Sequence, residues 1–412
     1  MRRGRGAERP AALVPLLLSI LLSCLSCAGA PAAPAAPASS PQPGSEPGAA
    51  GGGTALKGAA PQALSRALEE RRAVEAAVVF GSPSSIAKAF SLIAEATSLK
   101  EEEAFSLAWM GARIALLVYP ESADSFVPAD LRGQAELPAS PLARSLADAA
   151  AGRVPALLPE AEGTPLGELV PALAAFRSDS RETARRCLEA LDRFERLGAP
   201  SVLPGLVRGL DAERRKDFAR ALDYYAGVRS AAPDAWPASL GAARAYLALG
   251  RPAAAEELLR QVDPAAADSP PIRRVRARAL YDLGRLSEAE PLVLRILLED
   301  PQDSAFVLVR AHLLARSRSF QQAQPLLDAY GTVDPSNRRY LALRAEVAEG
   351  LRGRDEALKW ARRGLAAYPD DPELLAVAAR LLFAVPSTLR ADLVEAARSE
   401  GRELARRAEG QA

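Results

Sequence analysis

Histidine and cysteine are scarce in this chain of 412 residues, which holds one histidine and three cysteines. A single histidine, His312, excludes most histidine-dependent catalytic triads and histidine-rich metal sites. Cys24 and Cys27 lie near the N-terminus, so only Cys187 falls in the part that we expect to fold, and no disulfide framework is predicted. The folded part must therefore depend on side-chain packing for its stability.

Aromatic residues and an excess of either charge are also lacking. Aromatic residues make up 5% of the chain, and 52 Lys and Arg residues balance 51 Asp and Glu residues. The formal net charge of +1 gives no general attraction to phosphate backbones, so nucleic acid is not an expected partner. Abundant alanine with few aromatic residues favours closely packed helices over a β-sandwich. We expect an all-α protein.

Several motifs of common catalytic classes are missing, among them H-E-x-x-H, G-x-S-x-G and G-x-x-x-x-G-K-[ST]. Ser85 and Lys88 match S-x-x-K, the nucleophile motif of penicillin-binding proteins and β-lactamases, but the S-D-N and K-T-G elements of those enzymes do not occur. The simpler interpretation places Ser85 in the first turn of a helix and Lys88 on its solvated face. We predict no catalytic residue, metal or cofactor, and no enzymatic activity.

The first 30 residues are typical of an export signal. Four arginines precede an apolar run at residues 11–22, which is shorter than the roughly 20 residues that a membrane-spanning helix needs. Residues 21–24, Leu-Leu-Ser-Cys, resemble a bacterial lipobox, in which the signal is removed and the new N-terminal cysteine is lipidated. The resemblance implies a signal peptide at residues 1–23 and a lipid on Cys24. The alternatives are cleavage after Ala30, with ordinary thiols in a discarded signal, or lipidation of Cys27.

Residues 24–58 are predicted to be a lipid anchor followed by a disordered tether. From Ala28 to Gly58 the chain is almost entirely Ala, Pro, Gly and Ser, which cannot bury enough apolar surface to offset the entropy of ordering. Such a chain is extended and would hold a folded body away from the membrane. Leu25 follows Cys24, whereas an Asp there would be the inner-membrane retention signal, so the resemblance implies the periplasmic face of the outer membrane. Membrane contact is expected only through the lipid.

The C-terminal half repeats with a period of 34 residues. Alanines mark this period at Ala221, Ala255, Ala289, Ala323 and Ala357. Twelve residues after four of these alanines come Pro233, Pro301, Pro335 and Pro369. We expect two helices to cross closely at each alanine, which leaves no room for a longer side chain. Asp-Pro pairs at residues 300–301, 334–335 and 371–372 suit helix starts, with Asp as the N-cap and Pro in the first turn.

A helix-turn-helix period of this length resembles the tetratricopeptide repeat family. Gly250 and Gly284 lie in Leu-Gly-Arg turns five residues before their alanines, where a residue with positive φ is useful. Further motif positions hold the aromatic residues Phe218, Phe320, Tyr246 and Tyr281. Lys216 and Arg318 replace the turn glycine, and Gly353 comes one residue late. We expect these departures to loosen their turns without breaking the register.

The resemblance implies a right-handed solenoid of helix pairs, with repeats 1 to 5 at residues 202–370 and capping helices at residues 371–412. Residues 165–201 are predicted to be a degenerate repeat, in which Cys187 takes the small-residue position 34 residues before Ala221. Residues 59–164 are expected to form a smaller helical region that does not keep the period. Within it, Ser82 and Pro83 suit a helix start.

The family resemblance also implies a binding function, in which the first helices of the pairs line a groove that holds a protein or peptide. The residues eleven positions before each motif alanine are expected there, and with neighbours one turn away they make the middle of the groove basic. The predicted ligand-binding residues are Arg244, Arg274, Arg278, His312 and Arg316. Because arginine pairs with carboxylates through two parallel hydrogen bonds, an acidic peptide or a free C-terminal carboxylate is the expected ligand. The alternative is that these arginines form a solvated helix face.

We therefore expect a lipid-anchored periplasmic scaffold or adaptor. Two other functions remain open at this point. One is a subunit of a cell-wall-directed enzyme, with its activity in the helical region before the repeats. The other is a transport-accessory lipoprotein, which would bind a small ligand in a deep apolar cavity.

Overall fold

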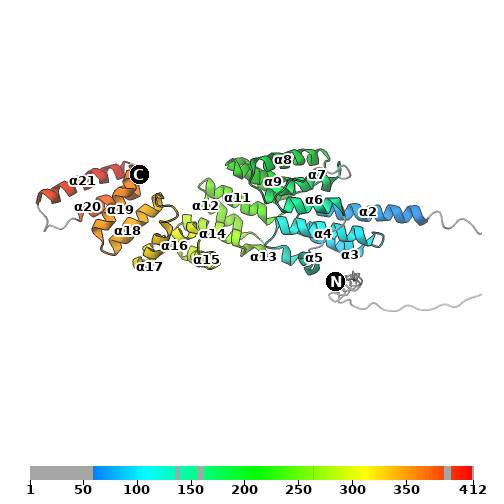
Figure 1. The fold of residues 1–412 in the computed structure, drawn as a ribbon, viewed down its shortest axis with the longest axis horizontal. Helices are drawn as coiled ribbons and strands as arrows, with labels where there is room; N and C mark the ends of the chain where they lie inside the picture. Colours follow the sequence, from blue (N-terminus) through cyan, green and yellow to red (C-terminus); the bar gives the residue numbers. More distant parts are fainter. Residues whose placement is uncertain (1–58, 135–139, 156–161, 263, 385–390, 411–412) are drawn as a thin grey trace, which may run out of the picture. The chain divides into compact units, whose positions relative to one another are not determined.

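The computed structural model describes residues 59–134, 140–155, 162–262, 264–384 and 391–410. Every regular element in these ranges is a helix, which confirms the all-α prediction for the described part (Figure 1). Within the same ranges, no helix is long and apolar enough to cross a membrane. The predicted signal peptide, Cys24 and the tether lie outside the described residues. The chain divides into two compact units, Met1–Ala238 (unit 1) and Ser239–Ala412 (unit 2).

Unit 1 holds short and long helices packed around a 3-10 helix. Its first elements are α2 (Ala59–Phe80), α3 (Pro83–Glu95), α4 (Glu101–Val118), η2 (Ala123–Ser125), α5 (Ala129–Gly133) and α6 (Pro141–Ala150). They are followed by α7 (Pro165–Leu169), η3 (Val170–Phe176), α8 (Arg181–Arg196), α9 (Leu203–Arg214) and α10 (Phe218–Ala231). The apolar segment of η3 is buried and packs against α6, α7, α8 and α9, so it lies at the core of this unit.

The turn between α2 and α3 joins the N-terminal helices to later parts of unit 1. The Phe80 carbonyl accepts a hydrogen bond from the Val202 amide at 2.9 Å, and the Gly81 carbonyl accepts one from the Tyr119 hydroxyl at 2.8 Å. Asp234 Oδ2 accepts a third bond, from a backbone amide in the first turn of α3, at 2.7 Å. Unit 1 therefore extends past residue 202, where the repeats were predicted to begin.

Two predicted helix starts are confirmed. Ser82 accepts a hydrogen bond from the Ser85 amide at 3.2 Å, and Pro83 is the first residue of α3. Asp371 accepts one from the Leu374 amide at 2.9 Å, and the proline after it begins α20. In both cases the side-chain oxygen satisfies a backbone donor that has no partner within the helix.

The other two Asp-Pro pairs were wrongly predicted as helix starts. Asp300 and Asp334 close a turn through their carbonyls, which accept hydrogen bonds from the amides of Asp303 at 3.2 Å and Asn337 at 3.4 Å. Asp303 and Asn337 are the actual N-caps, since each side chain accepts a bond from an amide in the first helical turn. Both helices therefore begin after a second capping residue, which lies three positions beyond the predicted one.

Unit 2 is a row of consecutive helices. α11 (Trp236–Ala248) contains the boundary between the units, and it is followed by α12 (Pro252–Arg260), α13 (Pro264–Ala267), α14 (Pro270–Asp282), α15 (Leu286–Glu299), α16 (Ser304–Arg316), α17 (Phe320–Tyr330), α18 (Arg338–Gly350), α19 (Arg354–Ala367), α20 (Pro372–Phe383) and α21 (Ala391–Glu409). From α14 onward each helix packs against the next, and α18 also contacts α16 and α20. This is the arrangement of stacked helix pairs that the period predicts.

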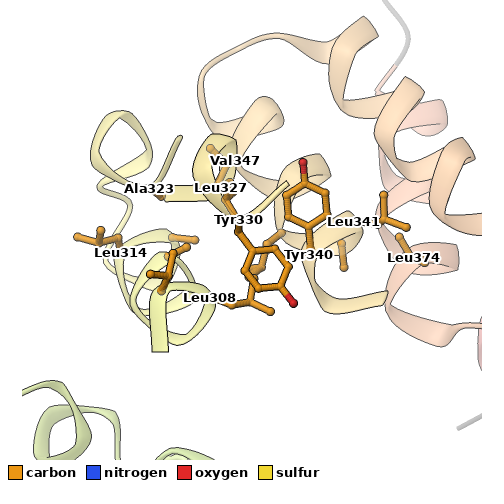
Figure 2. Close-up of a cluster of buried hydrophobic side chains, with 14 residues drawn as sticks. Leu308, Leu314, Ala323, Leu327, Tyr330, Tyr340, Leu341, Val347 and Leu374 are labelled. Carbon is orange, nitrogen blue, oxygen red and sulfur yellow. The ribbon is translucent and has the colours of Figure 1, made fainter. Parts of the chain in front are cut away.

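Two ladders of small residues allow the helices to approach closely. The predicted alanine ladder is confirmed, because Ala221, Ala255, Ala289, Ala323 and Ala357 have no exposed surface. A second ladder with the same period lies on the first helices of the pairs and is at most 4% exposed: Ala243, Ala277, Ala311, Ala345 and Ala379. One alanine from each ladder occurs in each of three buried clusters of unit 2. Figure 2 shows the cluster that joins α16, α17, α18 and α20.

The turns that end the first helices of the repeats share one backbone conformation. Their positive-φ residues are 34 positions apart: Lys216 (63°), Gly250 (70°), Gly284 (73°), Arg318 (59°) and Arg352 (64°). In all five turns the next amide donates to the carbonyl five residues back, at 2.8–2.9 Å. The prediction that departures from glycine loosen the turns was therefore wrong. The helix-ending hydrogen bonds hold even the long side chains of Lys and Arg residues in the left-handed region.

Replacing Arg318 with glycine is expected to stabilise the protein by about 1 kcal/mol, because a left-handed conformation costs a residue with a Cβ about 1–2 kcal/mol and glycine very little. Gly284→Ala is the matched control. Nothing lies within 4 Å of a Cβ built at Gly284, so only the φ of 73° penalises alanine there. Thermal melts should show opposite shifts for the two variants, and a lower melting temperature for Arg318→Gly would contradict the argument.

Candidate ligand-binding face

The first helices of the pairs in unit 2 present a continuous set of polar side chains, which we call the first-helix face. Its members follow the 34-residue period, with Arg278 on α14, His312 on α16, Glu346 on α18 and Arg380 on α20. Arg278 and Arg380 are exposed, and His312 and Glu346 are half-buried. Because α18 packs against both α16 and α20, these positions lie on neighbouring helices.

Tyr281, His312 and Arg339 meet at one point of this face. The Tyr281 hydroxyl forms a hydrogen bond with Nδ1 of His312, and the two rings are arranged edge to face with centroids 5.5 Å apart. The guanidinium carbon of Arg339 lies 4.5 Å from the centroid of the Tyr281 ring. Three helices, α14, α16 and α18, therefore contribute to one cluster.

Two of the three side chains of this cluster, His312 and Tyr281, are uncharged at pH 7. Burial, together with the positive charges of Arg339 and Arg316, lowers the pKa of His312 to about 4. Burial also raises the pKa of Tyr281 to about 12. At pH 7 the imidazole is thus unprotonated and the phenol is protonated, so neither adds a charge to the face.

The structure gives two of the predicted groove arginines acidic partners of their own. Arg274 forms ion pairs with Asp303 at 3.2 Å and Asp300 at 3.5 Å, which draws it toward the turn between α15 and α16. Arg278 pairs with Asp282 at 2.8 Å, one turn further along α14. Both charges are therefore largely balanced within the protein.

The remaining predicted residues lie at different places. Arg316 is exposed at the end of α16, one turn after His312. Arg244 lies on α11 and is half-buried, with an interaction partner of its own. The structure thus brings His312 and Arg316 together with Arg278 nearby, whereas binding of a ligand by any of the five residues stays a prediction.

Acidic side chains flank the cluster on its C-terminal side. Burial raises the pKa of Glu346, although the nearby charges of Arg316 and Arg380 oppose this shift. Glu349 pairs with Arg380 at 3.1 Å. The face therefore offers hydrogen-bond donors and acceptors in succession, as a surface for a polypeptide would. In the described ranges, no group of three or more His, Cys, Asp or Glu residues could hold a metal ion.

The two candidate nucleophiles have structural positions. Cys187 is fully buried in α8, where its thiol lies 3.5 Å from the Pro171 carbonyl, and burial raises its pKa to about 11. A thiol with this pKa stays protonated and is a poor nucleophile at pH 7. The Ser85 hydroxyl donates to the Ser82 carbonyl at 2.9 Å in the first turn of α3, and Lys88 is exposed.

Sequence reasoning missed Arg339 entirely and gave Tyr281 only a motif position. No periodic signal marks Arg339, because the equivalent positions in the neighbouring repeats hold Ala305 and Glu373. The second alanine ladder could have been found, since its members are 34 residues apart like those of the first ladder.

The tetratricopeptide repeat family model matches residues 213–279, a segment that runs from the end of α9 to α14. The chain contains tetratricopeptide repeats. The helix pairs of unit 2 continue beyond the matched segment through α20, and the turns at 34-residue spacing continue to Arg352. None of the curated proteins matches the chain.

Part of the chain is also similar to several solved structures. MamA of MSR-1 is 18% identical, with 45% of this chain and 97% of that chain covered and a TM-score of 0.35. YrrB, described as a TPR protein with an unusual peptide-binding site, is 16% identical, with 46% and 95% covered and a TM-score of 0.37. MamA of Desulfovibrio magneticus RS-1 is 16% identical, with 42% and 94% covered and a TM-score of 0.34.

Proposed function

We propose that this tetratricopeptide repeat protein is a scaffold that binds an acidic segment of a protein or peptide on the first-helix face of unit 2. The observation that carries the proposal is the succession of polar side chains on α14, α16, α18 and α20, because α14 contacts α16 through Tyr281 and His312 and α18 packs against both α16 and α20. An extended polypeptide can contact several such helices at once, which a small ligand cannot. Binding, and not catalysis, is the role that we assign to this face.

Among the predicted ligand-binding residues, Arg316 gives the strongest argument for an acidic partner. It is exposed, and none of the ion pairs of the described residues includes it, so Glu346 acts on it only through space. Its guanidinium can therefore pair with a carboxylate of the partner without breaking a contact within the protein. Such pairs favour specificity and rapid association, so the complex should weaken as salt concentration rises.

We further propose that the scaffold is exported and held in the cell envelope by a lipid on Cys24, at the periplasmic face of the outer membrane. The proposal is supported by the resemblance of residues 21–24 to a lipobox and by Leu25 after the cysteine. The Ala/Pro-rich segment up to Gly58 would then give the scaffold reach from the membrane surface.

Crosslinking in intact cells, followed by recovery of the full chain, tests the scaffold function. The double variant Arg278→Glu with Arg316→Glu is expected to recover at least tenfold less partner, because like charges would then face an acidic segment. The control variant Arg363→Glu with Arg398→Glu makes the same change of charge at exposed positions on α19 and α21. Equal recovery with both variants, each with unchanged helicity, would show that the partner binds elsewhere.

A further inference from the structure

The last three helices of unit 2, α19, α20 and α21 (Figure 1), surround a partly open cavity of about 280 Å³. It arises because α20 packs against both of the other helices, whereas α19 and α21 make little direct contact with each other. A Cβ added at Gly401 would lie 3.3 Å from Cβ of Leu382, so α21 already meets α20 at close range. The cavity is therefore the space left between α19 and α21, with α20 as its floor.

Most of the cavity lining is apolar. Its apolar side chains include Leu358, Leu365 and Ala366 from α19, Ala378 and Leu382 from α20, and Leu404 from α21. The leucines of α19 and α21 are only half-buried, so an apolar ligand would remove more of their surface from water. An apolar cavity of about 150 Å³ holds one benzene molecule, and the present volume therefore has room for roughly ten carbon atoms.

Two ion pairs extend across this space. Arg362 of α19 pairs with Glu400 of α21 at 2.9 Å, and Arg407 of α21 pairs with Asp370, in the turn after α19, at 3.0 Å. Residues 400 and 407 are two helical turns apart, so the pairs are separated by about 10 Å along α21. All four side chains are exposed, and ion pairs of this kind contribute little to stability. A ligand can therefore replace one of these contacts at little cost.

Arg407 is the better placed of the two arginines for an anionic group. Within the described ranges, its hydrogen bonds to the Pro369 carbonyl and to Asp370 use Nη2 alone, so Nε and Nη1 remain as donors. Its acidic partner, Asp370, is not among the residues that line the cavity, whereas Glu400, the partner of Arg362, is one of them. A ligand carboxylate beside Arg362 would thus meet a second carboxylate, and one beside Arg407 would meet only the edge of the cavity.

We propose that this cavity binds a fatty acid of roughly ten carbon atoms, with its alkyl chain between Leu365 and Leu404 and its carboxylate on Arg407. The volume limits the length of the chain, the apolar lining selects an alkyl group, and the unused donors of Arg407 select an acid. The charged residues of the site lie on α19 and α21 and not on the first-helix face, so the proposal does not depend on the scaffold function.

Calorimetric titration of the full chain with hexanoate, octanoate, decanoate and dodecanoate, each below its critical micelle concentration, tests the size of the site. Affinity is expected to rise about fourfold for each added CH2 group as far as decanoate. It should then level off, because further carbon atoms stay in water. Absence of binding, an affinity independent of chain length, or an equal rise through dodecanoate would overturn the proposal.

Two neighbouring alanines of α19 test the position of the chain. Ala366 and Ala367 are both exposed, but only Ala366 lines the cavity. Ala366→Leu fills part of the space and is expected to weaken decanoate binding at least tenfold, while hexanoate affinity changes less than threefold. Ala367→Leu is the matched control and should keep decanoate affinity within twofold. Equal decanoate affinities for the two variants would show that the chain binds elsewhere.

The two partners of the ion pair at Arg407 test the position of the carboxylate. Arg407→Gln is expected to weaken decanoate binding at least fivefold. Asp370→Asn should strengthen it about twofold, because a competing carboxylate is removed. If the pair only held α21 in place, both variants would weaken binding alike. Weaker binding in both variants, or no change in Arg407→Gln, would overturn the assignment of the carboxylate to Arg407.

Discussion

Gly81→Ala is expected to lower the free energy of unfolding by about 3 kcal/mol. Gly81 has a φ of 79°, which costs alanine about 1–2 kcal/mol. A Cβ at this position would also lie 2.5 Å from Cγ of Leu203, a fully buried side chain, and such overpacking costs about 1–3 kcal/mol. Both penalties act at the same residue, so relief of one does not remove the other.

The effect should reach the whole of unit 1, because the turn at Gly81 is bonded to segments far along the chain. Its carbonyl accepts from Tyr119, and the preceding carbonyl accepts from Val202. A shift of the turn that accommodates a Cβ would strain these bonds. Loss of a buried hydrogen bond costs about 1 kcal/mol more.

Gly227→Ala is the control for this variant. Gly227 lies within α10, and no heavy atom would come within 4 Å of its Cβ, so alanine should stabilise the helix by about 0.5–1 kcal/mol. Urea denaturation of the full chain measures both variants. A Gly81→Ala protein as stable as the unchanged chain would mean that the turn does not hold the two segments together.

Features that repeat along the chain were predictable, because several copies at the same spacing indicate the position of each one. The alanine ladder, represented by Ala289 and Ala323, was placed correctly from spacing alone and is fully buried. The turn position was also placed correctly, although Arg352 and not Gly353 takes the positive φ in the fifth repeat. The presence of a glycine at position 353 suggested the wrong residue, since the helix-ending hydrogen bonds decide which residue adopts the left-handed conformation.

Contacts that occur once were not predictable. The hydrogen bond from Trp236 Nε1 to Ser122 Oγ at 2.9 Å joins residues in segments with no shared pattern. The same holds for Arg339, whose position over Tyr281 depends on how α14 and α18 are placed by the helices between them. The sequence therefore predicts the helix pairs and their faces, whereas the partners of individual charges on those faces require the structure.

The predicted basic groove illustrates this difference. Sequence spacing put Arg274 and Arg278 on the face with equal weight, and neither spacing nor composition shows that both pair with aspartates of the same chain. These ion pairs reduce the charge that Arg274 and Arg278 can offer to a ligand, so Arg316 is the stronger candidate among the predicted residues.

Cys24→Ala is expected to abolish both fatty-acid labelling and membrane association of the protein. If the lipobox resemblance holds, the thiol of Cys24 carries the lipid, and each buried CH2 group of an acyl chain contributes about 0.8 kcal/mol to membrane affinity. The chain would lose this contribution entirely. Growth with a fatty-acid analogue, followed by fractionation of the cells, measures labelling and membrane association in one experiment.

The two other cysteines provide matched controls for Cys24→Ala. Cys187→Ala should keep full labelling, because the Cys187 thiol is buried in α8 and its pKa is raised to about 11 by that burial. Cys27→Ala should also keep full labelling, since the residue three positions before Cys27 is Cys24, where a lipobox has an aliphatic residue. Loss of label from Cys27→Ala with retention in Cys24→Ala would move the anchor to Cys27, and retention in Cys24→Ala together with retention in the double variant Cys24→Ala with Cys27→Ala would refute a lipid anchor at either cysteine.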